Sequence, residues 1–368
     1  MKLRNALAIA GKEWRHLRRD PRSLALLFLL PTMMLFLNGY AIRLDITEAP
    51  IGLLQESLDG ASNELAGHLG ASRAFQVVRH FEDRDAMQRA ISRHEVWAAF
   101  VIPHDYAQAL AHNNARVQLV LDGMDANTAR LVRNYALQLV NDFAQQRAGT
   151  APAVDLRYRT WFNETNESRY AIVPGAIVQM LAVVGALMTA LTIAREMESG
   201  NLVMLRTTPL TAAEFLLGKL APYLVIGMVV TLAAVAAAVF VFGVPLRGSL
   251  VDLTLVSVLF LLVVTVQGAL LSLLAGNQLL ASQLVQVTTF LPSYLLSGVI
   301  YAIANMPLAL QLITLLVPAR FYVTLTKALF LKGVPLSLLW PQAGALAIAL
   351  VVLGLLLARK AARLGLAR

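Results

Sequence analysis

Long apolar runs separated by short polar segments dominate the chain. An uncharged apolar run of about 20 residues is the length that a helix needs to cross a bilayer. The pattern therefore predicts six transmembrane helices. In the first of them, Pro31 and Asn38 are costly in lipid, and we expect both to face protein. The predicted spans are 23–43, 171–194, 220–242, 253–275, 282–301 and 341–358.

The segment between the first two spans, residues 44–170, has a different pattern. It carries 16 of the 22 acidic residues, and short strand-like runs alternate with helical ones. This order predicts a small α/β domain with a partly parallel sheet. The predicted fold is thus an α-helical membrane protein with six transmembrane helices and an inserted extracytoplasmic α/β domain. Strands are expected at 51–54, 75–78, 96–102, 117–121 and 154–161, and helices at 61–69, 85–91, 106–111 and 128–146.

Two further segments have apolar patterns that do not predict a simple span. Residues 302–340 contain an apolar piece, 308–317, that is too short to cross a membrane, so an interfacial or re-entrant segment is expected. In residues 1–22 apolar side chains recur at helical spacing, which predicts an amphipathic helix along the membrane surface. A basic cluster that only orients the first span remains the alternative. The recurring residues are Leu3, Leu7, Ala10, Trp14 and Leu17.

Composition and charge support a membrane protein with both termini in the cytoplasm. The chain is 58% hydrophobic and 14% charged, against about 25% charged in soluble domains. The net charge of +9 does not indicate nucleic-acid binding, because the basic residues gather beside spans. Seven Lys or Arg lie in 1–22 and four in the tail, 359–368. Such clusters mark cytoplasmic segments, which places 44–170 outside and 195–219 inside.

The sequence shows no enzyme motif and no energy source within the spans. It has no cysteine, its histidines are scattered, and it lacks a phosphate-binding loop. Acidic pairs such as Glu82/Asp83 and Asp122/Asp125 fit turn and cap roles better than catalysis. Ion-driven transporters place ionisable residues inside spans, whereas none lies centrally in these six. The driving energy is therefore expected to come from another protein.

Neutral amides are the polar residues within the predicted spans. Gln283 and Gln286 are three residues apart on one face of the fifth span, with Phe290 a turn later. They could line a pathway, or they could form hydrogen bonds between helices, and the sequence leaves both interpretations open. The other amides in the spans are Asn38, Gln179 and Gln267.

One polar stretch, residues 195–223, lies between two long apolar runs and carries a dense set of turn and cap signals. Charged residues at its start mark the end of the second span, and Gly200 begins a turn. Thr208 can cap a helix that starts at Pro209, with Glu214 beyond its first turn. The pattern predicts a short amphipathic helix across the cytoplasmic mouth, followed by the next span. The charged residues at the start are Arg195, Glu196 and Glu198.

This stretch resembles the loop after the second span in ABC-2 type permeases, the membrane subunits of ABC exporters. The match continues in the outer segment, at Asp122-Gly123, 125–129 and Tyr135, and in the last outer hairpin. It is nearest to paired permeases of bacterial drug-type efflux systems that work with a periplasmic adaptor. The positions that match the loop are Arg195, Glu196, Glu198, Gly200, Thr208, Pro209, Glu214, Leu216, Gly218, Lys219, Pro222 and Tyr223.

The resemblance implies a division of labour between subunits of an inner-membrane complex. A separate ATP-binding subunit would bind ATP and magnesium and dock on the N-terminal helix and on 195–219. This chain would hold no cofactor, metal or catalytic residue. Two permeases, alike or paralogous, would form the pathway with their second and fifth spans, in contact with lipid and without nucleic acid. The pathway candidates are Gln179, Gln283, Gln286 and Phe290.

The expected function is export of a hydrophobic or amphipathic small molecule, driven by a partner ATPase. Two other classes stay open at this stage. A sensor would bind a ligand through residues 45–169 and need no ATP hydrolysis. A secondary transporter would depend on an ion gradient, which the uncharged spans disfavour.

Overall fold

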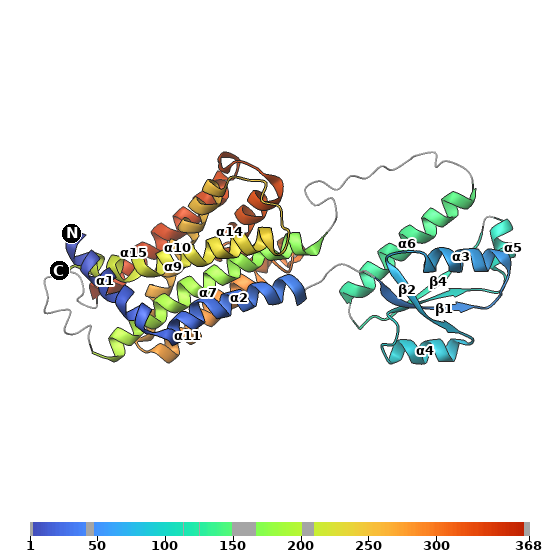
Figure 1. Ribbon diagram of the computed structural model, residues 1–368, viewed down its shortest axis with the longest axis horizontal. Coiled ribbons are helices and arrows are strands. Elements are labelled where there is room, and N and C mark those ends of the chain that lie inside the picture. The colour runs from blue at the N-terminus through green and yellow to red at the C-terminus, as the bar shows by residue number, and fades with distance from the viewer. Residues whose placement is uncertain are drawn as a thin grey trace. The chain divides into compact units, whose positions relative to one another are not determined.

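The computed structural model describes residues 3–41, 48–112, 114–124, 126–148, 167–200 and 210–363. The chain folds into two compact units. The helical unit combines Met1–Arg43 with Thr160–Arg368, and the α/β unit is Leu44–Arg159 (Figure 1).

The helical unit is built around α7 (Ser168–Glu198), which packs against α2 (Pro21–Ala41), α9 (Ala212–Phe240) and α10 (Leu250–Ala275). Of the apolar window of α7, 83% is buried inside the unit, so this helix forms the core. The last helix, α15 (Trp340–Arg363), is only 11% buried by the same measure and presents most of its apolar surface outward.

Four helices in the described residues are long and apolar enough to cross a membrane: 169–198, α9, α10 and α15. A bent pair, Leu308–Thr314 with Pro318–Lys332, would make a fifth. The predicted first and fifth spans are not among them. The fifth is composed of α11 (Gln278–Val285), the π-helix η1 (Gln286–Phe290) and α12 (Leu291–Leu295). Six spans therefore remain a prediction.

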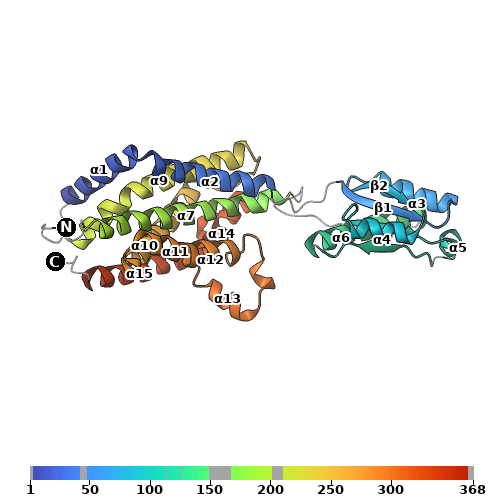
Figure 2. The same cartoon turned by 90° about the horizontal axis from the view of Figure 1, so that it is seen from below.

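The bent pair has one anchored arm and one exposed arm. Its two helices, α13 (Leu308–Thr314) and α14 (Pro318–Lys327), meet at 84°, as expected for a re-entrant or broken segment. In α14 the buried Tyr322 stacks on Phe260 of α10, with ring centroids 4.3 Å apart. By contrast, α13 projects from the bundle (Figure 2), and apolar side chains along it are exposed.

The α/β unit has a four-stranded mixed sheet in the order β2-β1-β3-β4, with β1, β2 and β3 parallel and β4 antiparallel to β3. All four strands and all four helices predicted between 49 and 148 are present, while the strand predicted at 154–161 lies outside the described residues. The elements are β1 (Ala49–Gln55), α3 (Gly60–Gly70), β2 (Phe75–Phe81), α4 (Arg84–Ser92), β3 (Ala98–Ile102), α5 (Tyr106–Ala111), β4 (Gln118–Leu121) and α6 (Ala126–Ala148).

Both faces of this sheet are covered, which explains its apolar central strands. One core includes Ile51, Leu53 and Phe100, packed with residues of α3 and α6. The other core lies on the α4 side and includes Leu54 and Met87. A strand that is buried on both faces needs a continuous apolar run rather than an alternating one. All five residues of β3 are buried accordingly.

Ion pairs fix the ends of several elements of the α/β unit. The Arg84 guanidinium donates to the Glu56 carboxylate at 2.8 Å and lowers the pKa of Glu56. The backbone N–H of Met124 and the His94 side chain donate to Asp122, and together they lower the pKa of that carboxyl group. The acid forms of these groups are therefore disfavoured in the folded unit.

The stability of the α/β unit is expected to be constant above about pH 5 and to fall as the pH drops below about 4.5, near the ordinary pKa of Glu56. A carboxyl group whose folded pKa is lowered favours folding when ionised, and this contribution is lost as the pH falls through the folded value. Urea unfolding of the full chain, reported by a dye on a cysteine introduced into this unit, measures the effect. The Glu56→Gln variant should lose part of the pH dependence; an unchanged profile would contradict this account.

Candidate functional site

A buried cluster of charged residues joins three helices at one end of the helical unit. The ammonium group of Lys219, in α9, lies 2.7 Å from Glu13 Oε1 of α1 (Leu3–Arg19) and 3.0 Å from Glu196 Oε1 of α7. The Lys12 ammonium reaches the same Glu196 oxygen at 3.1 Å. The Lys219 and Glu13 side chains are each only 3% exposed. Removing one member would leave its partners as uncompensated buried charges.

A glycine lets α1 approach α9 closely enough to form this cluster. A Cβ atom at Gly218 would lie 2.7 Å from the Ala6 carbonyl oxygen and 2.7 Å from Ile9 Cβ. Contacts this short are not tolerated, so any side chain at this position would force α1 away from α9. Gly218 thus contributes through close packing, next to the lysine that holds the ion pairs.

Helix α1 packs on the bundle with a face that includes Ala6 and Glu13, while part of its apolar stripe points away from the bundle. Its buried residues include Ala6, Glu13 and Leu17, whereas Leu7 and Trp14 are exposed. The predicted stripe of Leu3, Leu7, Ala10, Trp14 and Leu17 is therefore split. The ion pair with Lys219 holds Glu13 on the inward side of the helix, and Leu7 and Trp14 lie on the outward side.

The other charged residues at the end of α7 connect it to two more elements. Arg195 lies 3.2 Å from His16 Nε2 and 3.7 Å from Asp20 Oδ2, at the end of α1. Glu198 accepts a hydrogen bond of 2.8 Å from the backbone N–H of Gln278, at the start of α11. Together with Glu196, these residues make the end of α7 a junction of α1, α9 and α11.

The start of α9 corrects the predicted helix boundary. Thr211, not Thr208, is the N-cap: its hydroxyl accepts from the Glu214 N–H at 3.2 Å, and Glu214 accepts from the Thr211 N–H. Residues 212–217 form the first turns of α9 itself, which continues without a break through Gly218 and Pro222 into the apolar run. The predicted start of a helix at Pro209, with its cap Thr208, lies outside the described residues. The described part of that helix, from Ala212, is continuous with the third predicted span.

The remaining matched positions of this stretch have local structural roles. Gly200 ends α7 with a left-handed backbone, φ +72°, that glycine adopts without strain. Tyr223 Oη lies 2.6 Å from Thr192 Oγ1 and so joins α9 to α7 one turn away from the charged cluster. Pro222 is buried inside α9. Glu214, also buried, accepts from the Asn5 side chain of α1 at 3.1 Å.

The contacting residues of α1 were absent from the set predicted from sequence. Lys12, Glu13 and Asn5 contact three of the matched positions, and Gln278 contacts a fourth. The sequence does contain one indication of these contacts. Glu13 and Asp20 are the only acidic residues in 1–22, which also holds seven basic ones, and both form ion pairs with residues of 195–223. An acidic residue within a basic segment indicates a specific partner.

The structure separates the four pathway candidates. Helix α7 and the fifth predicted span run antiparallel, with Glu198 beside Gln278 and Gly175 against Val299. Gln179 is fully buried near the end marked by Gly175 and Val299. Gln283 and Gln286 are exposed and lie nearer the other end, where the charged cluster is. In the described part of the chain, Gln179 therefore lies apart from Gln283 and Gln286. Gln283 and Gln286 do share one exposed surface, as their spacing predicts.

Gln179 and the π-helix are two unusual features of the pathway region. Neither polar atom of the Gln179 side chain has a hydrogen-bond partner in the described part of the chain. Buried polar groups are nearly always paired, so an unpaired amide calls for a specific explanation. The π-helix η1 contains Gln286 and ends at Phe290, whose ring stacks with Tyr294. Single π-turns inside helices occur frequently at functional sites.

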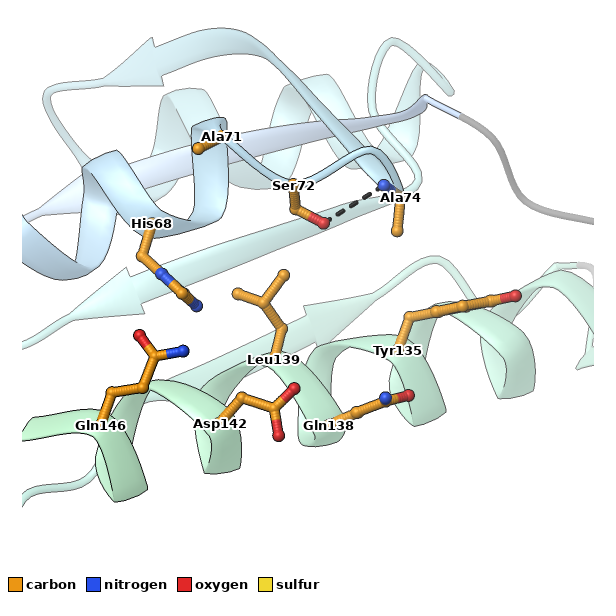
Figure 3. Close-up of a pocket in the computed structure, with 9 residues that line it drawn as sticks. All are labelled: His68, Ala71, Ser72, Ala74, Tyr135, Gln138, Leu139, Asp142 and Gln146. Atoms are coloured by element: carbon orange, nitrogen blue, oxygen red, sulfur yellow. Dashed lines mark hydrogen bonds between the residues drawn. The ribbon is translucent and has the colours of Figure 1, made fainter. Parts of the chain in front are cut away.

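The α/β unit has an open hollow of about 330 Å³ between α3 and α6 (Figure 3). The side chains of His68 and Gln146 point toward one another across it, and Tyr135 and Asp142 lie along α6. No group of three potential metal ligands occurs in the residues that the structure describes. None of the lining residues has a buried polar atom without a partner, so the hollow does not single out a ligand.

The fold and the cluster define a multi-pass helical membrane protein whose charged residues connect helices at one end of the bundle. A family model described as ABC-2 family transporter protein matches residues 22–359. Among curated proteins, the chain is 35% identical to "Probable multidrug ABC transporter permease YbhS" of Escherichia coli K12, over 90% of this chain and 89% of that protein. It is 29% identical to "Probable multidrug ABC transporter permease YbhR" of the same organism, over 89% and 90%.

A third relative, "Inner membrane transport permease YhhJ" of Escherichia coli K12, is 25% identical over 92% of both chains. The chain therefore belongs to the ABC-2 transporter family, as its sequence resemblance implies. It is a membrane permease subunit of an ABC exporter, a transport subunit rather than an enzyme.

Proposed function

We propose that the end of α7, together with α1 and the start of α9, receives movement from a separate ATP-binding subunit and passes it to the membrane helices. The observation that carries this proposal is the buried cluster of Glu13, Lys219 and Glu196. It ties the surface helix α1 to α7, the core of the helical unit. A push on α1 is thereby transmitted through ion pairs and through the tight contact at Gly218.

The proposed orientation places α1 and both termini in the cytoplasm. The basic residues of 1–22 and 359–368 support it, because positive charge favours the cytoplasmic side. With six spans, residues 44–170 would form a periplasmic domain of an inner-membrane protein. Exposed Leu7 and Trp14 on α1 are then available to the ATP-binding subunit, which would hold ATP and magnesium.

A second permease, identical or paralogous, would complete the translocation pathway. The exposed face of the fifth span, with Gln283 and Gln286, supports this assembly, because amides that face bare lipid are unfavourable. The cargo would be a hydrophobic or amphipathic small molecule, in keeping with uncharged spans and with the multidrug names of two relatives. A periplasmic adaptor protein could then dock on the α/β unit.

Reconstitution in proteoliposomes tests the proposal. The permease, reconstituted together with its ATP-binding subunit, should export a hydrophobic fluorescent dye when ATP and magnesium are supplied. A catalytically dead ATPase is the control. ATP-independent flux that collapses with the ion gradient would favour a secondary transporter. Ligand binding by the full chain without any transport would favour a sensor with a site such as the hollow between α3 and α6.

The Gln179→Leu variant should be more stable than the natural chain and transport less. Removing an unpaired buried amide recovers about 1–3 kcal/mol of desolvation cost. If Gln179 serves the pathway, export should nevertheless fall several-fold. The melting temperature in detergent and the dye export rate measure the two effects. Gln283→Leu is the control for the stability effect alone, because its amide is exposed and its removal should not raise the melting temperature. A Gln179→Leu variant that is more stable and exports normally would show that Gln179 has no role in transport.

A further inference from the structure

A cavity of about 380 Å³ lies between α10, the bent pair and α15, and its lining includes no residue of the charged cluster and none of the pathway candidates. Its walls are apolar except at Gln267, which α10 contributes. Phe321 of α14 and Ala349 and Val352 of α15 form much of the lining. The volume falls within the range of small-molecule pockets, about 300–1,000 Å³.

The cavity opens toward the bilayer. Ile348 and Val352, on its α15 side, are 66% and 50% exposed, and Leu316, beside the bend, is 83% exposed. Because α15 is the least buried of the four candidate spans, these side chains face the surroundings of the helical unit. In a membrane those surroundings are hydrocarbon, so a ligand can enter from the lipid without passing through water.

Gln267 gives the cavity a chemical preference. Its side-chain oxygen is buried, and no described residue donates a hydrogen bond to it. A lone acceptor in an apolar setting is unfavourable until a donor arrives. A ligand with a hydroxyl group would supply that donor, whereas a plain hydrocarbon chain would leave the oxygen unpaired.

The charge at the cavity argues for a neutral ligand. No ionisable side chain lines it in the described part of the chain. The nearest cation in sequence, Arg320, donates to the Gln311 carbonyl oxygen at 3.1 Å and to the Thr314 hydroxyl group. Its guanidinium is thus engaged within the bent pair, and Arg320 is not among the residues that line the cavity.

We propose that this cavity binds a neutral membrane amphiphile, with its hydroxyl group donating to Gln267 and its hydrocarbon body packed between Phe321 and α15. The site is separate from the transport pathway. It does not depend on the proposed coupling to an ATPase, because occupancy requires neither ATP nor a second subunit. A bound molecule would bridge the bent pair to α15, two elements that otherwise leave much apolar surface exposed.

Photo-labelling of the full chain in lipid nanodiscs tests the proposal. The probes are a long-chain fatty alcohol that carries a diazirine and the matching diazirine alkane. The alcohol should label peptides that contain 315–321 and 345–353 about ten-fold more than the alkane, the gain expected from one hydrogen bond in a dry site. In Gln267→Leu this preference should disappear.

Two tryptophan variants locate the label. Ala349→Trp should fill the cavity and reduce labelling by both probes, whereas Val351→Trp, on a different and exposed face of α15, should leave it unchanged. Equal labelling by alcohol and alkane, unaffected by Gln267→Leu, would overturn the proposal and show general lipid contact only. Absence of label from both peptides would also overturn it. If Ala349→Trp fails to fold, the alcohol-to-alkane labelling ratio of Gln267→Leu, compared with that of the natural chain, still tests the proposal.

Discussion

Glu196→Lys is expected to abolish ATP-driven export, while Glu198→Lys should keep most of it. Both carboxylates belong to the same matched motif, but the structure gives them different surroundings. Glu196 is buried between Lys219 and Lys12, so a lysine there would replace two ion pairs by repulsion among three ammonium groups. Breaking a buried pair costs about 3–5 kcal/mol, which would reduce the docked population of α1 about a hundred-fold or more.

Glu198, by contrast, is exposed and accepts hydrogen bonds from Gln278. Its replacement should lower export less than about three-fold, in line with the small contribution of exposed polar contacts. Glu196→Gln keeps a hydrogen-bond acceptor without the charge, so its export should lie between that of Glu196→Lys and that of Glu198→Lys. Export per ATP hydrolysed is the measurement, with membrane yield as the control for insertion. Equal effects of Glu196→Lys and Glu198→Lys would contradict the assignment.

Gly218→Leu should detach α1 and reduce export more than about ten-fold. The added Cβ alone would lie 2.7 Å from the Ala6 carbonyl oxygen, and the rest of the side chain has no room between α1 and α9. Intrinsic helix propensity would favour leucine over glycine by about 0.5–1 kcal/mol, so a loss of function cannot come from a weaker α9. It must come from the displaced α1.

Gly354→Leu is the matched control, because a Cβ atom at this position of α15 meets nothing within 4 Å and lies on neither α1 nor α9. It should export within about two-fold of the natural chain. Trypsin cleavage after the basic residues of α1 reports docking directly: it should accelerate in Gly218→Leu and stay unchanged in Gly354→Leu. Export at normal levels from Gly218→Leu would show that the contact of α1 with α9 carries no movement.

The fold of the α/β unit follows from the sequence because its signals are local. Asp59 and Asp83 each cap the next helix through a side-chain hydrogen bond, and short apolar runs between such caps can only be strands. The helical unit is less predictable at its ends. The boundary of α9 depends on whether Thr208 or Thr211 caps it, and a threonine at either position suits that role equally.

The candidate site was predictable only in part, for a physical reason. Turn and cap residues such as Gly200 and Glu214 act within a few positions of the chain, so a local pattern indicates them. The pairing of Lys219 with Glu13 joins residues more than two hundred positions apart, and no local pattern records it. Which side of α1 faces α9 depends on that pair, so the apolar spacing alone does not predict it.

The inward packing of α1 also changes what its apolar residues indicate. Leu7 and Trp14 lie on the membrane in the sequence-based prediction, which stays a prediction, and the buried ion pairs turn the other side of α1 to the bundle. In the proposed assembly, these two exposed side chains form part of the surface that meets the ATP-binding subunit. The site therefore has two sides: charged and buried toward α7, apolar and exposed toward the partner.

Cysteine crosslinking to the ATP-binding subunit tests the central claim most directly, because the natural chain contains no cysteine. Single cysteines at Leu7 and Trp14 should crosslink to the ATPase in the assembled complex. Cysteines at Leu355, on the exposed surface of α15, and at Met124, in the α/β unit, should not. A complex that exports normally but crosslinks to the ATPase from Met124, and not from Leu7 or Trp14, would contradict both the proposed orientation and the role of α1.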